Sequence, residues 1–260
     1  MIVDMHNHTP LCNHAEGTIQ EYVLSAITAK TEFFGFSDHA PMDFDPKYRM
    51  KFNQMQKYEK DVLNAQKTYA KEIQILLGYE VDYLPGHMDK RVLTADVDYL
   101  IGSIHFLEGW GFDNPEFIGK WDEQNIDEIW QKYFNTIEAM AKTKLFDIVG
   151  HLDLIKVFKF MPKSDIVKMA IPALLAIKDS GMVLELNVAG YRKKVQEPYP
   201  SKALLQKAYE LNIPITFSSD AHKPEQVAMY NDEIIALAKE VGYTHCSYFI
   251  KRKEYIVKFM

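Results

Sequence analysis

The sequence opens with Met1-Ile2-Val3-Asp4-Met5-His6-Asn7-His8-Thr9-Pro10-Leu11-Cys12-Asn13-His14-Ala15-Glu16. A short apolar run, typical of a strand over residues 2–5, leads directly into three closely spaced histidines. Alternation along a strand points His6 and His8 to the same side, so that two imidazoles can converge on one cation. A His-x-His pair alone is a weak signal of a metal site. Whether this pair forms a metal site therefore depends on which other residues the fold brings close to it.

Six further short apolar runs resemble the first and predict strands at 33–37, 73–79, 99–103, 146–149, 182–186 and 213–217. Segments with helical periodicity separate them, at 18–30, 54–72, 127–144, 165–180, 201–211 and 225–241. Seven repeats of strand and helix indicate a closed α/β barrel. Because no Ser/Gly/Pro-rich linker interrupts the pattern, we expect one domain over 1–260. The glycine- and aromatic-rich stretch at 106–121 reads as a loop that could wall a pocket.

Polar residues stand at or just after the end of each predicted strand: His6 and His8, Asp38 and His39, Glu80, His105, His151, Asn187, and Asp220 with His222. In α/β barrels the carboxyl ends of the strands surround one mouth, which His14 can also reach from its loop. A single histidine at a strand end is more often a hydrogen-bonded loop residue. Seven of the nine histidines lie at such places, however, and together they predict a metal site. Imidazole and carboxylate donors favour Zn, Mn, Fe or Co over Ca.

Composition narrows the class of protein further. With 47% hydrophobic and 25% charged residues among 260, the chain is typical of a globular protein. A formal charge of −6 gives no electrostatic footprint for long nucleic acid, and the small basic cluster at 251–253 reads as a solvated turn. No apolar run is long enough for a membrane helix, and the first residues lack the pattern of a signal peptide. With only two cysteines, a cytoplasmic protein without a membrane partner is expected.

Taken together, the motifs resemble the polymerase and histidinol phosphatase (PHP) family of metal-dependent phosphoesterases over essentially the whole chain. The family's ligand pattern is filled without substitution by His6, His8, His14, His39, Glu80, His105, His151, Asp220 and His222. The resemblance implies a distorted, TIM-barrel-like (β/α)7 barrel whose active site lies at the C-terminal ends of the strands. It also implies three divalent metal ions (Zn, Mn or Fe), held by His6, His8, Glu80 and Asp220, by Glu80, His105 and His151, and by His14, His39 and His222.

Within the family, the opening motif and residues 187–193 resemble the stand-alone histidinol-phosphatase branch. In that branch an arginine at the position of Arg192 is expected to hold the substrate phosphate, and a second basic residue is expected at Lys156, where arginine is usual. Glu16 is a candidate partner for a cationic amino group of the substrate, or for the helix that starts near Thr18. Asp220, His222 and Arg192 are the candidate catalytic residues. Asp38 and Asp153 are candidates to orient the imidazoles of His39 and His151.

The resemblance implies a metal-dependent phosphomonoesterase of histidine biosynthesis. It would hydrolyse L-histidinol phosphate to L-histidinol and phosphate with metal-activated hydroxide at a trinuclear site. One alternative keeps the barrel and the metals but makes a nucleotide or a short oligonucleotide the substrate. Another is a non-catalytic metal-binding module, against which the complete ligand set argues. The general acid and the oligomeric state stay open at this stage.

Overall fold

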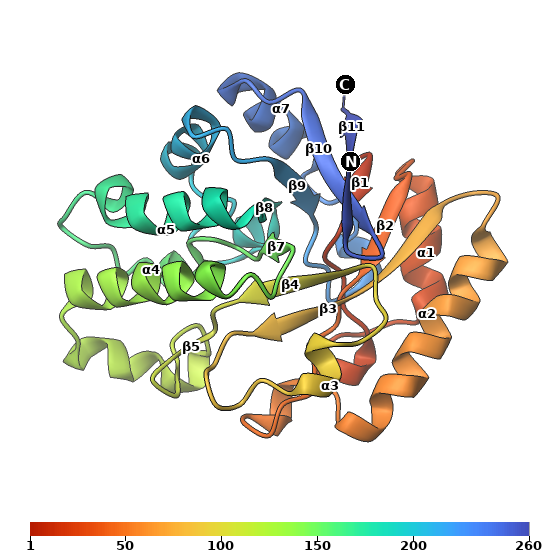
Figure 1. Ribbon diagram of the computed structural model, residues 1–260, viewed down its shortest axis with the longest axis horizontal. Helices are drawn as coiled ribbons and strands as arrows, with labels where there is room; N and C mark the ends of the chain where they lie inside the picture. Colours follow the sequence, from red (N-terminus) through yellow and green to blue (C-terminus); the bar gives the residue numbers. More distant parts are fainter. Residues whose placement is uncertain (260) are drawn as a thin grey trace.

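The computed structural model describes residues 1–259, and a sheet of seven parallel strands forms its centre (Figure 1). The order around the sheet is β1-β2-β3-β4-β7-β8-β9. The strands are β1 (Val3–Asp4), β2 (Phe33–Phe36), β3 (Gln74–Asp82), β4 (Tyr99–Ser103), β7 (Ile148–Val149), β8 (Val183–Asn187) and β9 (Ile215–Ser218). Each of the seven predicted strands is present, and the predicted barrel is confirmed.

The sheet closes where its first strand meets its last, which we call the β1–β9 seam. The Met5 amide donates to the Phe217 carbonyl at 3.0 Å, and the His8 amide donates to the Ala221 carbonyl at 3.0 Å. Between these two backbone hydrogen bonds, the side chain of Asp4 links β1 to the end of β9. Its carboxylate accepts from the Ser219 amide at 2.9 Å and from the Ser219 hydroxyl at 2.6 Å. The barrel is therefore nearly closed, and side chains complete part of the seam.

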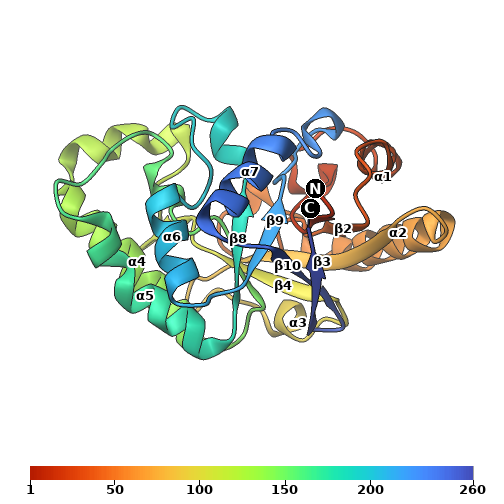
Figure 2. The same cartoon turned by 90° about the horizontal axis from the view of Figure 1, so that it is seen from above.

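Helices form a layer outside the strands, as Figures 1 and 2 show. They are α1 (Ile19–Thr28), α2 (Met55–Tyr69), the short α3 (Lys90–Leu93), α4 (Ile126–Thr143), α5 (Ile166–Ser180), α6 (Lys202–Glu210) and α7 (Asn231–Val241). Local caps explain several boundaries. Thr18 and Glu21 form a capping box at the start of α1, and Gly181 adopts a left-handed conformation that ends α5.

Three parts of the sequence-based prediction were incomplete. Helix α7 begins at Asn231 and not near 225, because Pro224–Gln226 forms a 3-10 turn and both Ala228 and Tyr230 take positive φ angles. The 106–121 stretch contains a small hairpin, β5 (Phe106–Leu107) with β6 (Trp110–Gly111), and the 3-10 segment Pro115–Glu123 begins within it. A second hairpin, β10 (His245–Ile250) with β11 (Lys253–Lys258), was not predicted.

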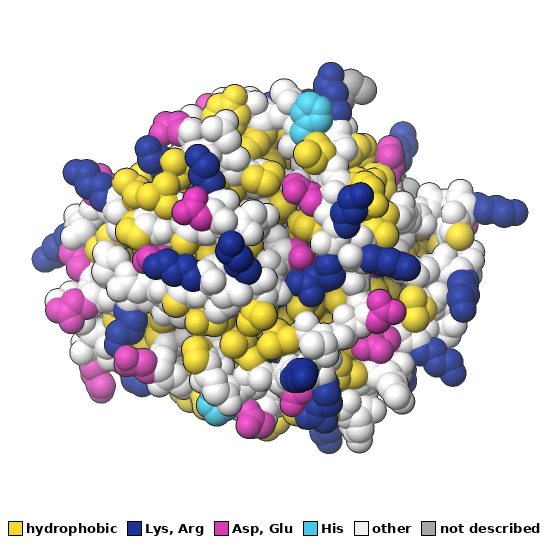
Figure 3. Space-filling model, in the orientation of Figure 1, with side chains coloured by type: hydrophobic (Ala, Val, Ile, Leu, Met, Phe, Trp, Pro, Cys, Tyr) yellow, Lys and Arg dark blue, Asp and Glu magenta, His cyan; other side chains and the backbone are white. Residues whose placement is uncertain are grey.

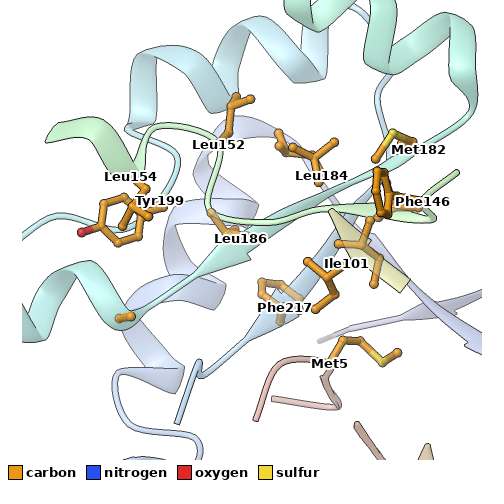
Figure 4. Packing of buried hydrophobic residues seen from close by; sticks show 14 of the residues in the cluster. Met5, Ile101, Phe146, Leu152, Leu154, Met182, Leu184, Leu186, Tyr199 and Phe217 are labelled. Atoms are coloured by element: carbon orange, nitrogen blue, oxygen red, sulfur yellow. The ribbon is translucent and has the colours of Figure 1, made fainter. Parts of the chain in front are cut away.

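Aromatic packing fills the barrel and requires glycine on neighbouring strands. The Tyr99 hydroxyl crosses the interior and donates to the Met5 carbonyl at 2.6 Å. A Cβ atom at Gly35 or Gly78 would lie 2.1 Å or 2.6 Å from the Tyr99 side chain, so only glycine fits beside it. Figure 4 shows other buried members of this core, including Met5, Ile101, Leu186 and Phe217.

The surface seen in Figure 3 carries basic and acidic side chains interspersed with apolar ones. On that face no continuous basic stripe is visible among the described residues. Within residues 1–259, no helix combines the length and the apolar character needed to cross a membrane. Lys251 and Arg252 of the basic cluster form the turn between β10 and β11, and Lys253 begins β11. Arg252 pairs with Asp147, which precedes β7.

Candidate metal centre and active site

The nine predicted ligands meet at the carboxyl ends of the barrel strands, around the carboxylate of Glu80. This side chain is 1% exposed. Its Oε2 atom lies 3.3 Å from His6 Nε2 and 2.9 Å from His39 Nδ1. Its Oε1 atom lies 2.9 Å from His151 Nε2 and 3.6 Å from His105 Nε2. One carboxylate from β3 thus faces histidines from four different segments.

The ligand atoms fall into groups small enough to surround single ions, with all atoms of a group within 4.8 Å of one another. Three groups match the sets that the family resemblance implies: His6, His8 and Glu80; Glu80, His105 and His151; and His14, His39 and His222. Asp220 adjoins the first group, since its Oδ1 lies 3.2 Å from His8 Nε2. Two overlapping groups bring in Cys12, beside His8 and His222, and Asp82, beside His39 and His105.

Several buried atoms of this cluster lie close to one another without the geometry of a hydrogen bond, although buried polar atoms in proteins are nearly always paired. They include Nε2 of His6, Nε2 of His8, Nδ1 of His39 and Oε2 of Glu80. In the third group, Nε2 of His14 and Nε2 of His222 face each other at 3.0 Å. Unpaired nitrogen and carboxylate lone pairs that converge in this way fit divalent cations of the Zn, Mn or Fe type.

The surroundings raise the pKa of some of these histidines and lower the pKa of others. Burial alone would lower the pKa of His6, but the carboxylates of Glu80, Glu185 and Asp220 outweigh burial and raise that pKa well above its ordinary value. For His105, Asp82 and Glu80 outweigh burial and raise the pKa to about 10. By contrast, burial lowers the pKa of His39 to about 4, which leaves a neutral imidazole near pH 7.

Three carboxylates outside the ligand set orient ligand imidazoles. Glu185 Oε1 lies 2.7 Å from His6 Nδ1, Asp82 Oδ1 lies 2.7 Å from His105 Nδ1, and Asp38 Oδ1 lies 3.3 Å from His8 Nδ1. Such contacts fix the tautomer and direct the opposite ring nitrogen toward a metal. Buried Arg49 in turn donates to Asp82 at 2.8 Å.

This arrangement corrects the predicted partners of His39 and His151. Asp38 lies beside the His8 ring and meets His39 only through the backbone amide, which donates to Asp38 at 2.9 Å. Asp153 does not reach the His151 ring: its Oδ2 lies 3.0 Å from Lys156 Nζ and accepts the Ser201 amide at 2.9 Å. Sequence reasoning also missed Glu185 and Asp82, although the first is an acidic residue inside an apolar strand and the second follows Glu80 by one strand period. Arg49 lies in a loop and carries no such signal.

A cavity of about 460 Å³ opens above the histidine cluster. The loop after β4 walls part of it through Phe106, Gly111, Pro115 and Phe117, as the 106–121 stretch was predicted to do. Arg192 lines the cavity from the segment after β8. Its Nη2 atom donates to the carbonyls of Ser219 and Asp220, both at 2.8 Å, while Nη1 is buried without a partner. The guanidinium is thus held in place, and one of its nitrogens has no hydrogen-bond partner among the described residues.

The other two predicted substrate contacts lie outside the cavity lining. Lys156 is 1% exposed, and its ammonium lies 3.0 Å from the Asp153 carboxylate and donates to the Pro198 carbonyl at 2.8 Å. It therefore neutralises a buried carboxylate and has no free donor for phosphate, which corrects the prediction. Glu16 is exposed and pairs with Lys223 at 3.0 Å, so it is not placed to meet a substrate in this cavity.

Comparisons with known proteins agree with this geometry. The model of the PHP domain matches residues 4–189. A protein of Deinococcus radiodurans named "Probable histidinol-phosphatase" is 37% identical over 246 residues, which cover 93% of this chain and 94% of that protein. A "Histidinol-phosphatase" of Bacillus subtilis is 28% identical over 256 residues, covering 86% of this chain and 94% of that protein.

A solved structure extends the likeness to the fold. It is histidinol phosphate phosphatase of Lactococcus lactis, complexed with Zn, L-histidinol and phosphate. It superposes with a TM-score of 0.80 at 20% sequence identity, covering 97% of this chain and 98% of the other. The matching domain spans most of the chain and contains seven of the nine converging ligands, all but Asp220 and His222. On these grounds, this chain belongs to the PHP domain family.

Proposed function

We propose that this protein is a metal-dependent phosphomonoesterase of histidine biosynthesis that hydrolyses L-histidinol phosphate to L-histidinol and phosphate. One observation carries the reaction type: three candidate ligand groups, two of which share Glu80, lie at a cavity that Arg192 also lines. The names of the relatives from Deinococcus radiodurans and Bacillus subtilis support the choice of substrate.

A phosphate monoester dianion repels nucleophiles and has a poor alkoxide leaving group, so the site must counter charge and position the ester. Bound divalent ions would supply an activated water and neutralise the phosphoryl oxygens. Glu80, Asp220 and the seven histidines are the residues that would hold them. Arg192 adds a fixed cation at the cavity wall, and its guanidinium would hold a phosphate oxygen by a charge-assisted hydrogen bond.

Asp220 and His222 are proposed to act at the cavity wall, which both residues line. Asn187 donates to Asp220 Oδ2 at 3.2 Å, which turns Oδ1 toward His8. Burial would raise the pKa of Asp220, but the neighbouring histidines His6, His8 and His222 outweigh burial and hold that pKa well below its ordinary value. Asp220 is therefore an anion at neutral pH, suited to hold a cation beside the reacting phosphate.

Phosphate release from a panel of esters tests this function. Metal-reconstituted protein is assayed with L-histidinol phosphate, AMP, a sugar phosphate and a short 3'-phosphorylated oligonucleotide. A preference of at least about 100-fold in kcat/KM for L-histidinol phosphate is expected, equivalent to about 2.7 kcal/mol of transition-state discrimination. Equal or greater activity on AMP or the oligonucleotide would show that the protein is a phosphoesterase that acts on nucleotides. No activity on any ester would point to a metal-binding module.

We also propose that the protein works as a single domain in the cytoplasm. One cluster of buried hydrophobic residues extends from Met1 to Phe259 and supports a single domain. Both cysteines, Cys12 and Cys246, are free thiols in buried positions, which is typical of proteins in a reducing compartment.

A further inference from the structure

An acidic side chain that takes no part in the ligand set lines the same cavity. Asp113 follows the β5–β6 hairpin and lies among the residues of the cavity wall. Its neighbours hold the backbone in place: Trp121 Nε1 donates to the Phe112 carbonyl at 2.9 Å, and the Asn114 amide donates to the Gly111 carbonyl at 3.3 Å. The carboxylate is therefore presented from an anchored turn.

Asp113 differs from Asp82 and Glu185 in forming no ion pair among the described residues. Asp82 is paired with Arg49, and Glu185 with His6, each within 2.8 Å. Among residues 1–259, no lysine or arginine acts on the Asp113 carboxylate, and the ionisable side chains that do are His105, His151 and Asp82. Burial raises the pKa of Asp113, while His105 and His151 nearby oppose that rise. An ammonium group that entered the cavity would supply the missing counter-charge.

We propose that Asp113 is a specificity-determining residue that binds the primary ammonium group of the leaving alcohol. The inference rests on the proposed function, because L-histidinol phosphate carries such an amine near its ester carbon. Arg192 takes the anionic end of the substrate and Asp113 the cationic end. The cavity therefore selects an aminoalkyl phosphate from other phosphate monoesters by charge at both ends.

The test uses a pair of substrates that differ only in the amine. Wild-type protein, Asp113→Asn and Asp113→Glu, all metal-loaded, are assayed with L-histidinol phosphate and with 3-(imidazol-4-yl)propyl phosphate, which lacks the amino group. The matched control is Asp122→Asn, which removes the same charge from an exposed position in the same loop. Dissociation constants for L-histidinol and for its deamino analogue are measured by calorimetry, so that binding is read apart from turnover.

For Asp113→Asn we expect kcat/KM for L-histidinol phosphate to fall about 10- to 100-fold, mainly through KM, because a hydrogen bond to a charged group is lost. The deamino ester should change less than about twofold. L-Histidinol should bind more weakly by the same factor as the KM effect, Asp113→Glu should recover part of the loss, and Asp122→Asn should behave as wild type. Metal content and melting temperature should stay at the wild-type values, which a merely structural residue would not allow.

Equal losses on both esters would overturn the inference, since they would indicate a role in chemistry or folding. So would an unchanged KM for L-histidinol phosphate, or a deamino ester that remains dependent on Asp113. The proposed function fails by a different result, namely wild-type protein that hydrolyses neither ester. The calorimetric comparison of L-histidinol with its deamino analogue still decides the role of Asp113 in that case.

Discussion

The carboxylate of Glu185 serves two ligand histidines at once. Oε1 lies 2.7 Å from His6 Nδ1, and Oε2 accepts the backbone amide of His151 at 2.6 Å. Asn187 adds a third contact, at 3.1 Å to Oε2. A single buried side chain on β8 therefore fixes a ring from the first strand and the backbone of a ligand that follows β7.

Replacing Glu185 with glutamine tests this positioning role. Glu185→Gln keeps the shape but removes the charge that orients His6, so we expect metal affinity to fall about 10- to 100-fold with the fold intact. Competition with a chromophoric chelator measures the affinity, and circular dichroism checks the fold. Glu240→Gln, at an exposed ion pair with Lys202, is the control. Unchanged metal affinity in Glu185→Gln would contradict the role.

Substitution of Arg192 should weaken substrate binding and leave the metal content unchanged. In Arg192→Lys the charge remains but the fork that holds Ser219 and Asp220 while donating to phosphate is lost. We expect KM for the phosphate ester to rise about tenfold in Arg192→Lys and about 100-fold in Arg192→Ala, with metal content as in wild type. Steady-state kinetics and elemental analysis measure the two quantities. Loss of metal in either variant would show that Arg192 is misplaced, and Lys194→Ala controls for nearby surface charge.

At the residue scale, the convergence of the nine candidate ligands was predictable from the sequence, and their hydrogen-bond partners were only partly so. Strand ends share one rim of a barrel, and a run of histidines at those ends is visible in the sequence. Hydrogen-bond partners depend on side-chain direction within the barrel, which explains why Asp38 was assigned to His39 and Asp153 to His151. Asp113 and Arg49 come from irregular loops, whose paths the periodicity of the sequence does not encode.

At the element scale, the 3-10 turn after β7 depends on a buried ion pair. The turn Leu154–Lys156 carries Lys156 inward to Asp153, and the carbonyl of Pro198 binds the same ammonium. A second carboxylate, Glu197, approaches at 3.2 Å from the solvent side. The lysine thereby ties the segment after β7 to the segment after β8, which also carries Arg192.

Lys156→Met should therefore destabilise the fold and leave phosphate binding alone. The variant leaves the carboxylate of Asp153, which is 1% exposed, without its cationic partner. We therefore expect a loss of about 3 kcal/mol in the free energy of unfolding. Urea denaturation measures this loss, and KM for the ester at 20 °C should change less than about twofold. A raised KM with unchanged stability would restore Lys156 to the substrate site. The double variant Asp153→Asn/Lys156→Met should recover part of the stability.

The predicted elements differ in accuracy for a physical reason. Buried parallel strands give continuous apolar runs and were all found, whereas β11 exposes most of its residues and includes Lys253, Glu254 and Lys258, so it lacks that signal. The start of α7 was misplaced because a proline is equally suited to a 3-10 turn and to the first turn of an α-helix.

Over the whole molecule, the metal centre concentrates buried charge that metal-free protein must balance with protons. His105 shows this best, with its pKa raised to about 10 by Asp82 and Glu80 against the opposing effect of burial. Its ordinary value is about 6.5. A raised folded-state pKa gives stability that is complete below the ordinary value and is lost as the pH rises toward the folded value. Metal binding must displace such protons.

The melting temperature of chelator-treated protein should therefore fall as the pH rises from 7 to 10. For one such histidine the limit is about 1.4 kcal/mol per pH unit. Differential scanning calorimetry measures the trend, and Asp82→Asn should flatten it, because the pKa of His105 would return toward its ordinary range. Stability independent of pH in this interval would show that His105 is neutral in the metal-free protein.

Metal ions bound at this site would also hold the β1–β9 seam together. His6 and His8 stand on one side of it, Asp220 and His222 on the other, and Asp220 Oδ1 is only 3.2 Å from His8 Nε2 across the gap. An ion bound to residues of both sides would link the first and last strands of the sheet, which lie side by side although about 200 residues separate them in the sequence. The closure of the barrel and the chemistry of the site therefore depend on the same side chains.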